Sequence, residues 1–308
     1  MMRSKVVKPR GHYINTHFTK IINERVRYCL RTTSRRSPSG VIVQGPTGIG
    51  KTTLLELIQE TINNEYIKDG LLPPVYIVGA PTLPSTKEYY SEILDALGDH
   101  NAFFGTANAI KVRLFERLVA MQVKVLIFDE FQQLVEKRGE KVVHQTMDDI
   151  KRISDDFQIA CVFVGTNKVA ELTEINEQIA SRFGQVININ YMRFSSAKSQ
   201  AITCKFMDEY VKAHNILGMD FSSYEASLRM FAATNGDLRI FVNLLDDATG
   251  FLTGSSMRPL TLPELGRAYS LMPKNIRLLG RSNPFSVDVS VIEDILKVTD
   301  LSAGGRPK

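Results

Sequence analysis

The chain has 308 residues, 44% of them hydrophobic, which is enough for about two domains with buried cores. No apolar run reaches the roughly 20 residues that a membrane-spanning helix needs, and the basic N-terminus lacks the apolar stretch of a signal peptide. Cys29, Cys161 and Cys204 are too few and too widely spaced for a disulfide framework or a zinc cluster. We therefore expect a cytoplasmic protein with no membrane partner.

Charge is distributed unevenly along the chain. The net charge is +5, yet residues 1–40 hold ten Lys and Arg against the single acid Glu24, which is a net +9. The remaining residues hold 28 Lys and Arg against 32 Asp and Glu, which is a net −4. Cationic side chains release counterions from nucleic-acid phosphates, so this basic arm favours a nucleic-acid partner. A merely solvated tail would have the same composition.

Apolar periodicity predicts a helix over residues 17–30, followed by strands that alternate with helices. The predicted strands cover residues 40–44, 75–78, 123–128, 159–164 and 186–189. One predicted helix begins at residue 53, and three further helices cover residues 87–97, 108–121 and 142–157. Strands separated by helices of this length form a largely parallel sheet that is covered on both faces. The predicted fold class is therefore α/β, with a parallel five-stranded sheet flanked by helices.

Strand patterns stop after residue 190, which divides the chain into parts. Helical patterns at 196–214, 221–233 and 238–251 predict a small helical lid after the sheet. The chain beyond it is rich in Pro and Gly, with weak helices near 262–270 and 289–298. We expect four parts: a basic arm and helix (1–36), an α/β nucleotide-binding domain (37–192), a helical lid (193–253) and a partner-docking appendage (254–308).

A glycine-rich turn joins the first predicted strand to the following helix, and it matches the phosphate-binding pattern GxxxxGK[ST]. Such a turn directs backbone N–H groups at one spot, where the helix N-terminus adds positive potential. Lys51 can reach the β- and γ-phosphates, and the Thr52 hydroxyl can ligate Mg²⁺. The sequence thus predicts a nucleoside triphosphate site with these residues: Gly45, Pro46, Thr47, Gly48, Ile49, Gly50, Lys51, Thr52 and Thr53.

Two acids, Asp129 and Glu130, follow the third predicted strand. An Asp at the tip of a strand can hold Mg²⁺, and the next Glu can orient the water that attacks the γ-phosphate. An Asp-Glu pair alone favours a solvated turn, but its position after the phosphate loop favours hydrolysis. A guanine-reading Asn-Lys-x-Asp is missing, because Asn167-Lys168 is followed by Val169 and Ala170. We therefore expect ATP and Mg²⁺ as cofactors.

Three further polar side chains are candidates for the same site. Asn167 ends the fourth predicted strand and can bind the attacking water or the γ-phosphate, or else open an Asx-turn. Arg182 can reach a neighbouring subunit's γ-phosphate in trans, or else form an ion pair at the surface. Arg239 begins a lid helix and can sense the γ-phosphate, unless it is simply solvated.

These motifs, in this order, resemble those of an AAA+ ATPase. Within that superfamily the chain is similar to the TniB/TnsC transposition regulators and distantly similar to MuB, through residues 45–53, 126–130, 162–167 and 176–183. The resemblance implies an ATPase that oligomerises as a ring or filament on duplex DNA when ATP is bound. It also implies that the assembly recruits a transposase and a target-selection protein, and that hydrolysis disassembles it.

The duplex would be held mainly through its phosphates, so we expect weak sequence specificity. Candidate contacts, each of which could instead be a solvated surface residue, are Thr86, Lys87, Thr106 and Lys111. Two other functions fit the motifs: a helicase loader or initiator-like ATPase that prefers single strands, and a signalling or secretion ATPase whose nucleotide gates a protein partner.

Overall fold

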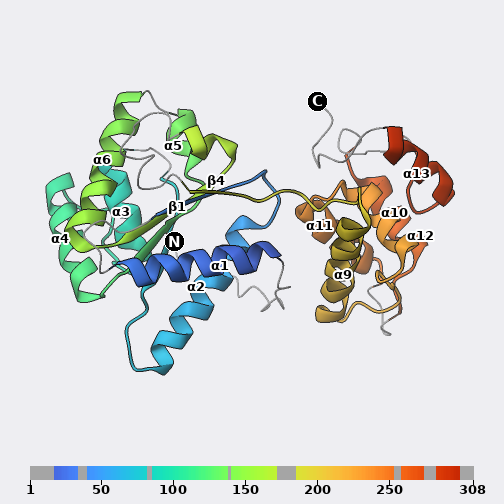
Figure 1. The fold of residues 1–308 in the computed structure, drawn as a ribbon, viewed down its shortest axis with the longest axis horizontal. Helices are drawn as coiled ribbons and strands as arrows, with labels where there is room; N and C mark the ends of the chain where they lie inside the picture. Colours follow the sequence, from blue (N-terminus) through green and yellow to red (C-terminus); the bar gives the residue numbers. More distant parts are fainter. Residues whose placement is uncertain are drawn as a thin grey trace. The chain divides into compact units, whose positions relative to one another are not determined.

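The computed structural model describes residues 17–33, 40–81, 85–137, 140–171, 185–252, 258–273 and 282–298 (Figure 1). The chain forms two compact units, which divide between Ile189 and Asn190. The first unit contains the β-sheet, and the described part of the second unit is helical. None of the helices in the described ranges is long and apolar enough to cross a membrane.

The first unit is built on five parallel strands: β1 (Val41–Gln44), β2 (Val75–Val78), β3 (Val125–Phe128), β4 (Ala160–Gly165) and β5 (Val186–Asn188). Their order in the sheet is β2-β3-β4-β1-β5. This confirms the predicted α/β fold with a parallel five-stranded sheet. Because β4 lies between β1 and β3, the residues that follow these three strands share one edge of the sheet.

Helices cover both faces of the sheet. The helical elements of this unit are α1 (His17–Thr32), α2 (Lys51–Lys68), α3 (Thr86–Ala96), α4 (Ala107–Ala120), α5 (Gln132–Lys137), α6 (Glu140–Phe157) and the 3₁₀ helix η1 (Asn167–Glu171). Phe128 of β3 and Phe163 of β4 belong to the core shared with α3, α4 and α6. The residues that directly precede them, Ile127 and Val162, are also fully buried, but they lie outside that core. Since successive strand residues point to opposite faces, both faces are covered, with α1 and α2 on the other side (Figure 1).

Helix α1 packs within the first unit, whereas the sequence predicts a basic arm and helix (1–36) separate from the nucleotide-binding domain. Its Ile22 and Val26 are completely buried. Arg27 forms a bidentate ion pair with Glu65 of α2, with N–O distances of 2.7 and 2.6 Å. The apolar face of the helix therefore places it in the α/β unit despite the charge of the surrounding sequence.

The described helices of the second unit are α9 (Ala197–Ala213), α10 (Tyr224–Thr234), α11 (Leu238–Gly250), α12 (Leu262–Leu271) and α13 (Val289–Val298). Ser196, Ser223 and Asp237 cap the N-termini of α9, α10 and α11 through their side chains. The sequence predicts residues 254–308 as an appendage separate from the lid. Instead, Tyr269 of α12 and Ile292 of α13 are buried in the core that α9, α10 and α11 share.

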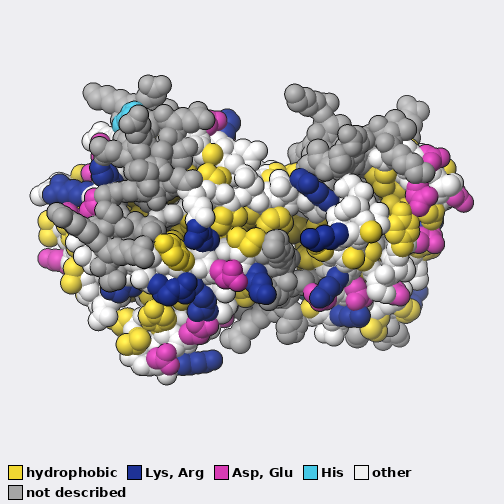
Figure 2. Space-filling model, viewed as in Figure 1, with side chains coloured by type: hydrophobic (Ala, Val, Ile, Leu, Met, Phe, Trp, Pro, Cys, Tyr) yellow, Lys and Arg dark blue, Asp and Glu magenta, His cyan; other side chains and the backbone are white. Residues whose placement is uncertain are grey.

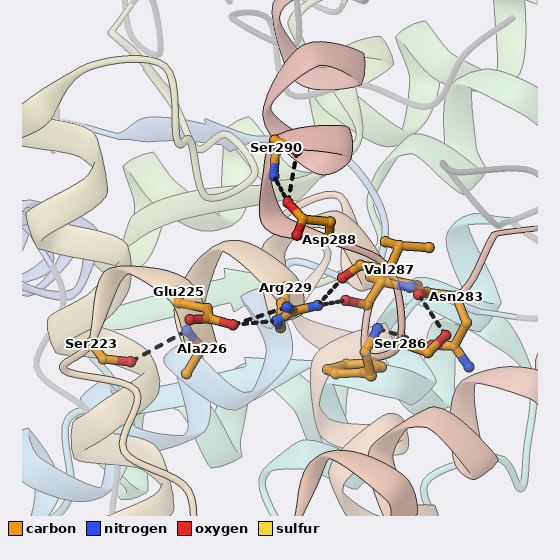
Figure 3. A network of polar contacts seen from close by, with 11 residues as sticks. Ser223, Glu225, Ala226, Arg229, Asn283, Ser286, Val287, Asp288 and Ser290 are labelled. Carbon is orange, nitrogen blue, oxygen red and sulfur yellow. Dashed lines mark hydrogen bonds and ion pairs between the residues drawn. The ribbon is translucent and has the colours of Figure 1, made fainter.

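A buried arginine joins α10 to the segment before α13 (Figure 3). Arg229 Nη1 donates to the carbonyl oxygens of Pro284 and Val287, at 2.6 and 2.8 Å. Its Nε and Nη2 donate to Oε1 of Glu225, one turn earlier on α10, at 3.0 and 2.9 Å. The guanidinium therefore fixes the chain that leads into α13.

Candidate active site

The phosphate loop connects β1 to α2, as the sequence predicts. Gly50 has a φ of 80°, a left-handed conformation that disfavours side chains with a Cβ, and α2 begins at the next residue. Its N-cap residue, Gly50, makes no side-chain cap hydrogen bond. Its first backbone N–H groups, together with the helix dipole, form a binding site for an anion such as a phosphate.

Three predicted site residues meet at the end of this loop. Lys51 is 6% exposed, and its Nζ donates to the carbonyl oxygens of Gly45 and Pro46, both at 2.9 Å. The Thr52 hydroxyl donates to Oδ2 of Asp129 at 2.6 Å. The sheet order therefore brings together groups that lie 77 residues apart in the chain.

Asp129 is a buried carboxylate at the tip of β3, with 7% of its surface exposed. Desolvation raises the pKa of this carboxyl, and hydrogen bonds from Thr52 and from the Glu130 backbone N–H oppose the rise. A cation beside it would offset the desolvation. Mg²⁺ takes oxygen ligands and keeps water and phosphate oxygens among them, so a hydroxyl and one carboxylate fit this ion.

Glu130 lies next to Asp129, and its carboxylate is held by Gln132, which no motif in the sequence identifies. The amide Nε2 of Gln132 donates to Oε2 of Glu130 at 2.6 Å. Oε1 of the same amide accepts from the backbone N–H of Thr166 at 3.2 Å. Gln132 is 5% exposed. A single sequence gives no signal for this contact, because the Thr166 partner is 34 residues away and becomes a neighbour only in the sheet.

The end of β4 completes this edge of the sheet. Gly165 O accepts from Gly45 N at 3.0 Å, which ties β4 to the phosphate loop. The buried Thr166 Oγ1 has no hydrogen-bond partner among the described residues, although such groups are normally paired. Asn167 is exposed and begins η1. Polar groups at this edge are thus available to a ligand or to water.

The other loop residues lie where the sequence places them, between β1 and the first turn of α2. Ile49 is buried, whereas Thr47 and Thr53 are exposed. Arg182 lies outside the described residues, so its proposed role in trans stays a prediction. Arg239 lies in the first turn of α11 in the second unit, where its backbone N–H donates to the Asp237 side chain at 2.9 Å. Its action on the nucleotide also stays a prediction.

The four candidate DNA contacts lie on α3 and α4 or at their ends, and three of them have roles within the protein. The Thr86 hydroxyl, in the first turn of α3, donates to Asp149 at 3.0 Å. Thr106 caps α4. The Lys111 ammonium lies 5.4 Å from the centre of the Phe115 ring. Lys87 is half-buried.

Known proteins resemble this chain in sequence and in fold. Residues 7–191 match the family model of the bacterial TniB protein. A curated relative, "Putative ribosome biogenesis ATPase nvl" of Dictyostelium discoideum, is 26% identical over 219 residues. That match covers 67% of this chain, which spans about a fifth (21%) of the length of the relative.

Solved structures with a similar fold include ORC and Cdc6 proteins. The ORC2 protein of Aeropyrum pernix, in its ADPNP-ADP complexes, gives a TM-score of 0.65 at 15% identity, covering 96% of this chain and 84% of that one. The ORC1 protein of the same organism, in complex with DNA, gives 0.61 at 17% identity, covering 94% and 84%. Cdc6p of Pyrobaculum aerophilum gives 0.62 at 14% identity, covering 98% and 84%.

These likenesses agree with the sheet order and with the loop that ends in Lys51 and Thr52. The family match extends over more than half of the chain and includes the whole α/β unit. The chain therefore belongs to the bacterial TniB protein family, and it is an AAA+ ATPase by fold and by its nucleotide-binding motifs.

Proposed function

We propose that this protein is an ATP-dependent transposition regulator that assembles on duplex DNA, recruits a transposase and a target-selection protein, and disassembles after hydrolysis. The observation that carries the proposal is the hydrogen bond between Thr52 and Asp129, in a chain of the TniB family. This contact pairs the end of the phosphate loop with the acid of β3. The same pairing is expected of a site that binds nucleotide with Mg²⁺.

Each group at the site has a separate task in this proposal. The N-terminus of α2 and Lys51 bind the phosphates of ATP. Thr52 and Asp129 would hold Mg²⁺, which when bound supplies positive charge to the phosphate oxygens. Glu130 orients the attacking water, and Asn167 contacts that water or the γ-phosphate.

Completion of the site by a second subunit would make ATP the switch for assembly. Arg182 is our candidate for the group that reaches a neighbour's γ-phosphate, and Arg239 for the sensor within the same chain. A ligand that bridges two subunits stabilises the assembled state by mass action. Hydrolysis removes the γ-phosphate, and with it the bridge between the subunits.

Basic side chains on α1 support duplex DNA as the partner of this assembly. Lys20 and Arg31 are exposed and Arg25 is half-buried, and Figure 2 shows dark blue side chains over the region that α1 occupies. Contacts from lysine and arginine to phosphates carry no sequence information and release counterions from the DNA. The affinity for duplex DNA should therefore fall steeply as the salt concentration rises. Lys87 and Lys111 are further candidates on α3 and α4.

Electron microscopy of the full chain with duplex DNA tests the proposal. We expect rings or filaments with a non-hydrolysable ATP analogue, and dispersed protein with ADP or without nucleotide. Glu130→Gln should still bind ATP, lose at least about 100-fold in turnover, and stay assembled on DNA, because removing a general base costs about 10²–10⁴-fold. Dispersed protein under all of these conditions would contradict the proposal.

The same experiment distinguishes the other candidate functions. A strong preference for single-stranded DNA, without assembly on a duplex, would favour a helicase loader or an initiator-like ATPase. The observation that favours this alternative is the fold likeness to the ORC2 protein and to the ORC1 protein, the latter solved in complex with DNA. Nucleotide-dependent assembly that ignores DNA would favour a signalling or secretion ATPase.

A further inference from the structure

We infer that Gln132 is a positioning residue, which holds the Glu130 carboxylate for water activation and connects it to the end of β4. This inference rests on the proposed ATP hydrolysis at the site. Gln132 lies in the first turn of α5, directly after the two acids of β3. Its amide contacts Glu130 on one side and Thr166 on the other, at 2.6 and 3.2 Å.

The chemistry of the two partners fixes the orientation of the amide. The backbone N–H of Thr166 can only donate, so it needs the amide oxygen. The ionised carboxylate of Glu130 can only accept, so it needs the amide NH₂. A reversed amide would lose both contacts. Gln132 is therefore held in one orientation, and it offers Glu130 a donor without adding charge to the site.

Glycine at position 165 leaves the space that the amide occupies. A Cβ built at Gly165 would lie 2.0 Å from Oε1 of Gln132 and 2.6 Å from Cγ2 of Val169. Any side chain at this position would displace the amide or the backbone of β4. The end of β4 thus has a glycine where Gln132 packs, next to the backbone N–H that orients it.

The backbone at Glu130 is held in a strained conformation that the neighbouring contacts maintain. Glu130 has a φ of 52°, which is unfavourable for a residue with a side chain. The next residue, Phe131, is 1% exposed, and its N–H donates to Val164 O at 2.9 Å. This turn directs the chain back toward β4 and places Gln132 beside Gly165. Strain of this kind persists where the surroundings over-determine it, often at functional sites.

These contacts form a connection from β4 to the acid. Thr166 directly precedes Asn167, our candidate for binding the γ-phosphate or the attacking water. A shift of the β4 end would move the Thr166 N–H, then the Gln132 amide and then the Glu130 carboxylate. The role of Gln132 is therefore to keep Glu130 in register with the strand end that contacts the γ-phosphate.

Steady-state ATP hydrolysis of the full chain with duplex DNA tests the inference through kcat and KM separately. Gln132→Met keeps the length of the side chain and removes both hydrogen bonds. We expect kcat to fall at least about tenfold, because Glu130 loses its orientation but is still present, while KM for ATP stays within about twofold. Gln59→Met on α2 is the matched control: it removes the hydrogen bond that the Gln59 amide donates to Val75 O of β2, so kcat should stay within about twofold.

A double variant tests whether Gln132 acts through Glu130. In a Glu130→Gln background, Gln132→Met should cause no further loss of kcat, because residues that act as a unit are not additive. A general structural defect would instead lower kcat in both backgrounds. A kcat of Gln132→Met within twofold of the unaltered protein would overturn the inference.

A second variant covers the case in which Gln132→Met does not fold. Gln132→Glu keeps the shape and the acceptor for Thr166, but it places a second carboxylate against Glu130, so kcat should fall at unchanged KM. Unchanged kcat in that variant would also overturn the inference. If Glu130→Gln hydrolysed ATP as fast as the unaltered protein, the proposed function would fail instead, so the two failures are distinguishable.

Discussion

Each of the two units contains a cluster of buried polar groups, and the clusters differ in how a buried charge is paired. In the helical unit, Arg229 is 8% exposed and its guanidinium donates to two carbonyl oxygens and one carboxylate (Figure 3). In the α/β unit, Asp129 is 7% exposed, and its hydrogen bonds within the described part of the chain come from a hydroxyl and a backbone N–H. Similar burial therefore accompanies very different pairing of charge.

The difference is visible in the electrostatics and the backbone. Desolvation raises the pKa of Asp129, so the folded protein disfavours the charged form that a metal ion would need. Glu130 next to it has a left-handed backbone. A cluster that serves only stability pairs its charges internally. A binding site instead leaves a charge for the ligand to pair with, and it tolerates the loss of folding stability that the unpaired charge causes. Removing charge should therefore affect the two clusters in opposite directions.

The largest effect on stability is expected at Arg229. Arg229→Met should lower the free energy of unfolding by about 2–4 kcal/mol, because the Pro284 and Val287 carbonyls lose their donor in a buried site. Chemical unfolding followed by circular dichroism measures the loss. Lys205→Met in the same unit is the matched control, since its pair with Glu209 is exposed and is worth less than about 1 kcal/mol. Equal losses in both variants would show that burial of Arg229 adds nothing.

The fold was largely predictable because its signals are local. Apolar, β-branched runs predicted all five strands, and helical periodicity predicted α1, α2, α3, α4 and α6. The short α5 was not predicted, since six residues after a turn give too little periodicity. The assignment of α12 and α13 to one core with the lid helices was also missed, because packing between separate helices leaves no local pattern in the sequence.

The site was predictable where one motif contains its chemistry. Lys51 and Thr52 follow from the glycine-rich loop, and Asp129 follows from its position after an apolar strand. Gln132 and Gly165 could not be found in this way, because their meeting depends on the order β3-β4-β1 in the sheet. Arg229 was missed for a similar reason: its backbone partners are 55 and 58 residues away.

A smaller effect, of opposite sign, is expected at Asp129. Asp129→Asn should leave the nucleotide-free protein as stable or more stable at neutral pH, because it removes a desolvated charge. Both contacts can survive: the Asn oxygen accepts from the Glu130 N–H, and the Asn NH₂ donates to the Thr52 hydroxyl. Binding of ATP with Mg²⁺ should nevertheless weaken at least about tenfold, because the anionic ligand is lost.

The pH dependence of this effect follows from the raised pKa. The folded protein binds the Asp129 proton more tightly than the unfolded chain, whose carboxyl keeps an ordinary pKa of 3.8. The cost of the charge is therefore fully present above the folded pKa and disappears as the pH falls through it toward 3.8. Thermal unfolding in the presence of EDTA measures the stability at neutral pH, where the cost of the charge is present, and at acidic pH, where it has disappeared. A lower melting temperature for Asp129→Asn at neutral pH would contradict the comparison.

The smallest effect is expected at Arg27, which has the bidentate geometry of a strong ion pair but a more exposed position. Its side chain is 31% exposed and that of Glu65 is 47% exposed, so Arg27→Ala should cost only about 0.2–1 kcal/mol, and less at high salt. The hydrogen bond from Arg27 lowers the pKa of Glu65, so this contribution is present above the ordinary value of 4.5 and is lost as the pH falls through the lowered pKa. Urea unfolding at two salt concentrations, with Lys20→Ala as the control on the same helix, measures it. If Arg27→Ala cost as much as Arg229→Met, bidentate geometry rather than burial would set the strength of these arginine contacts.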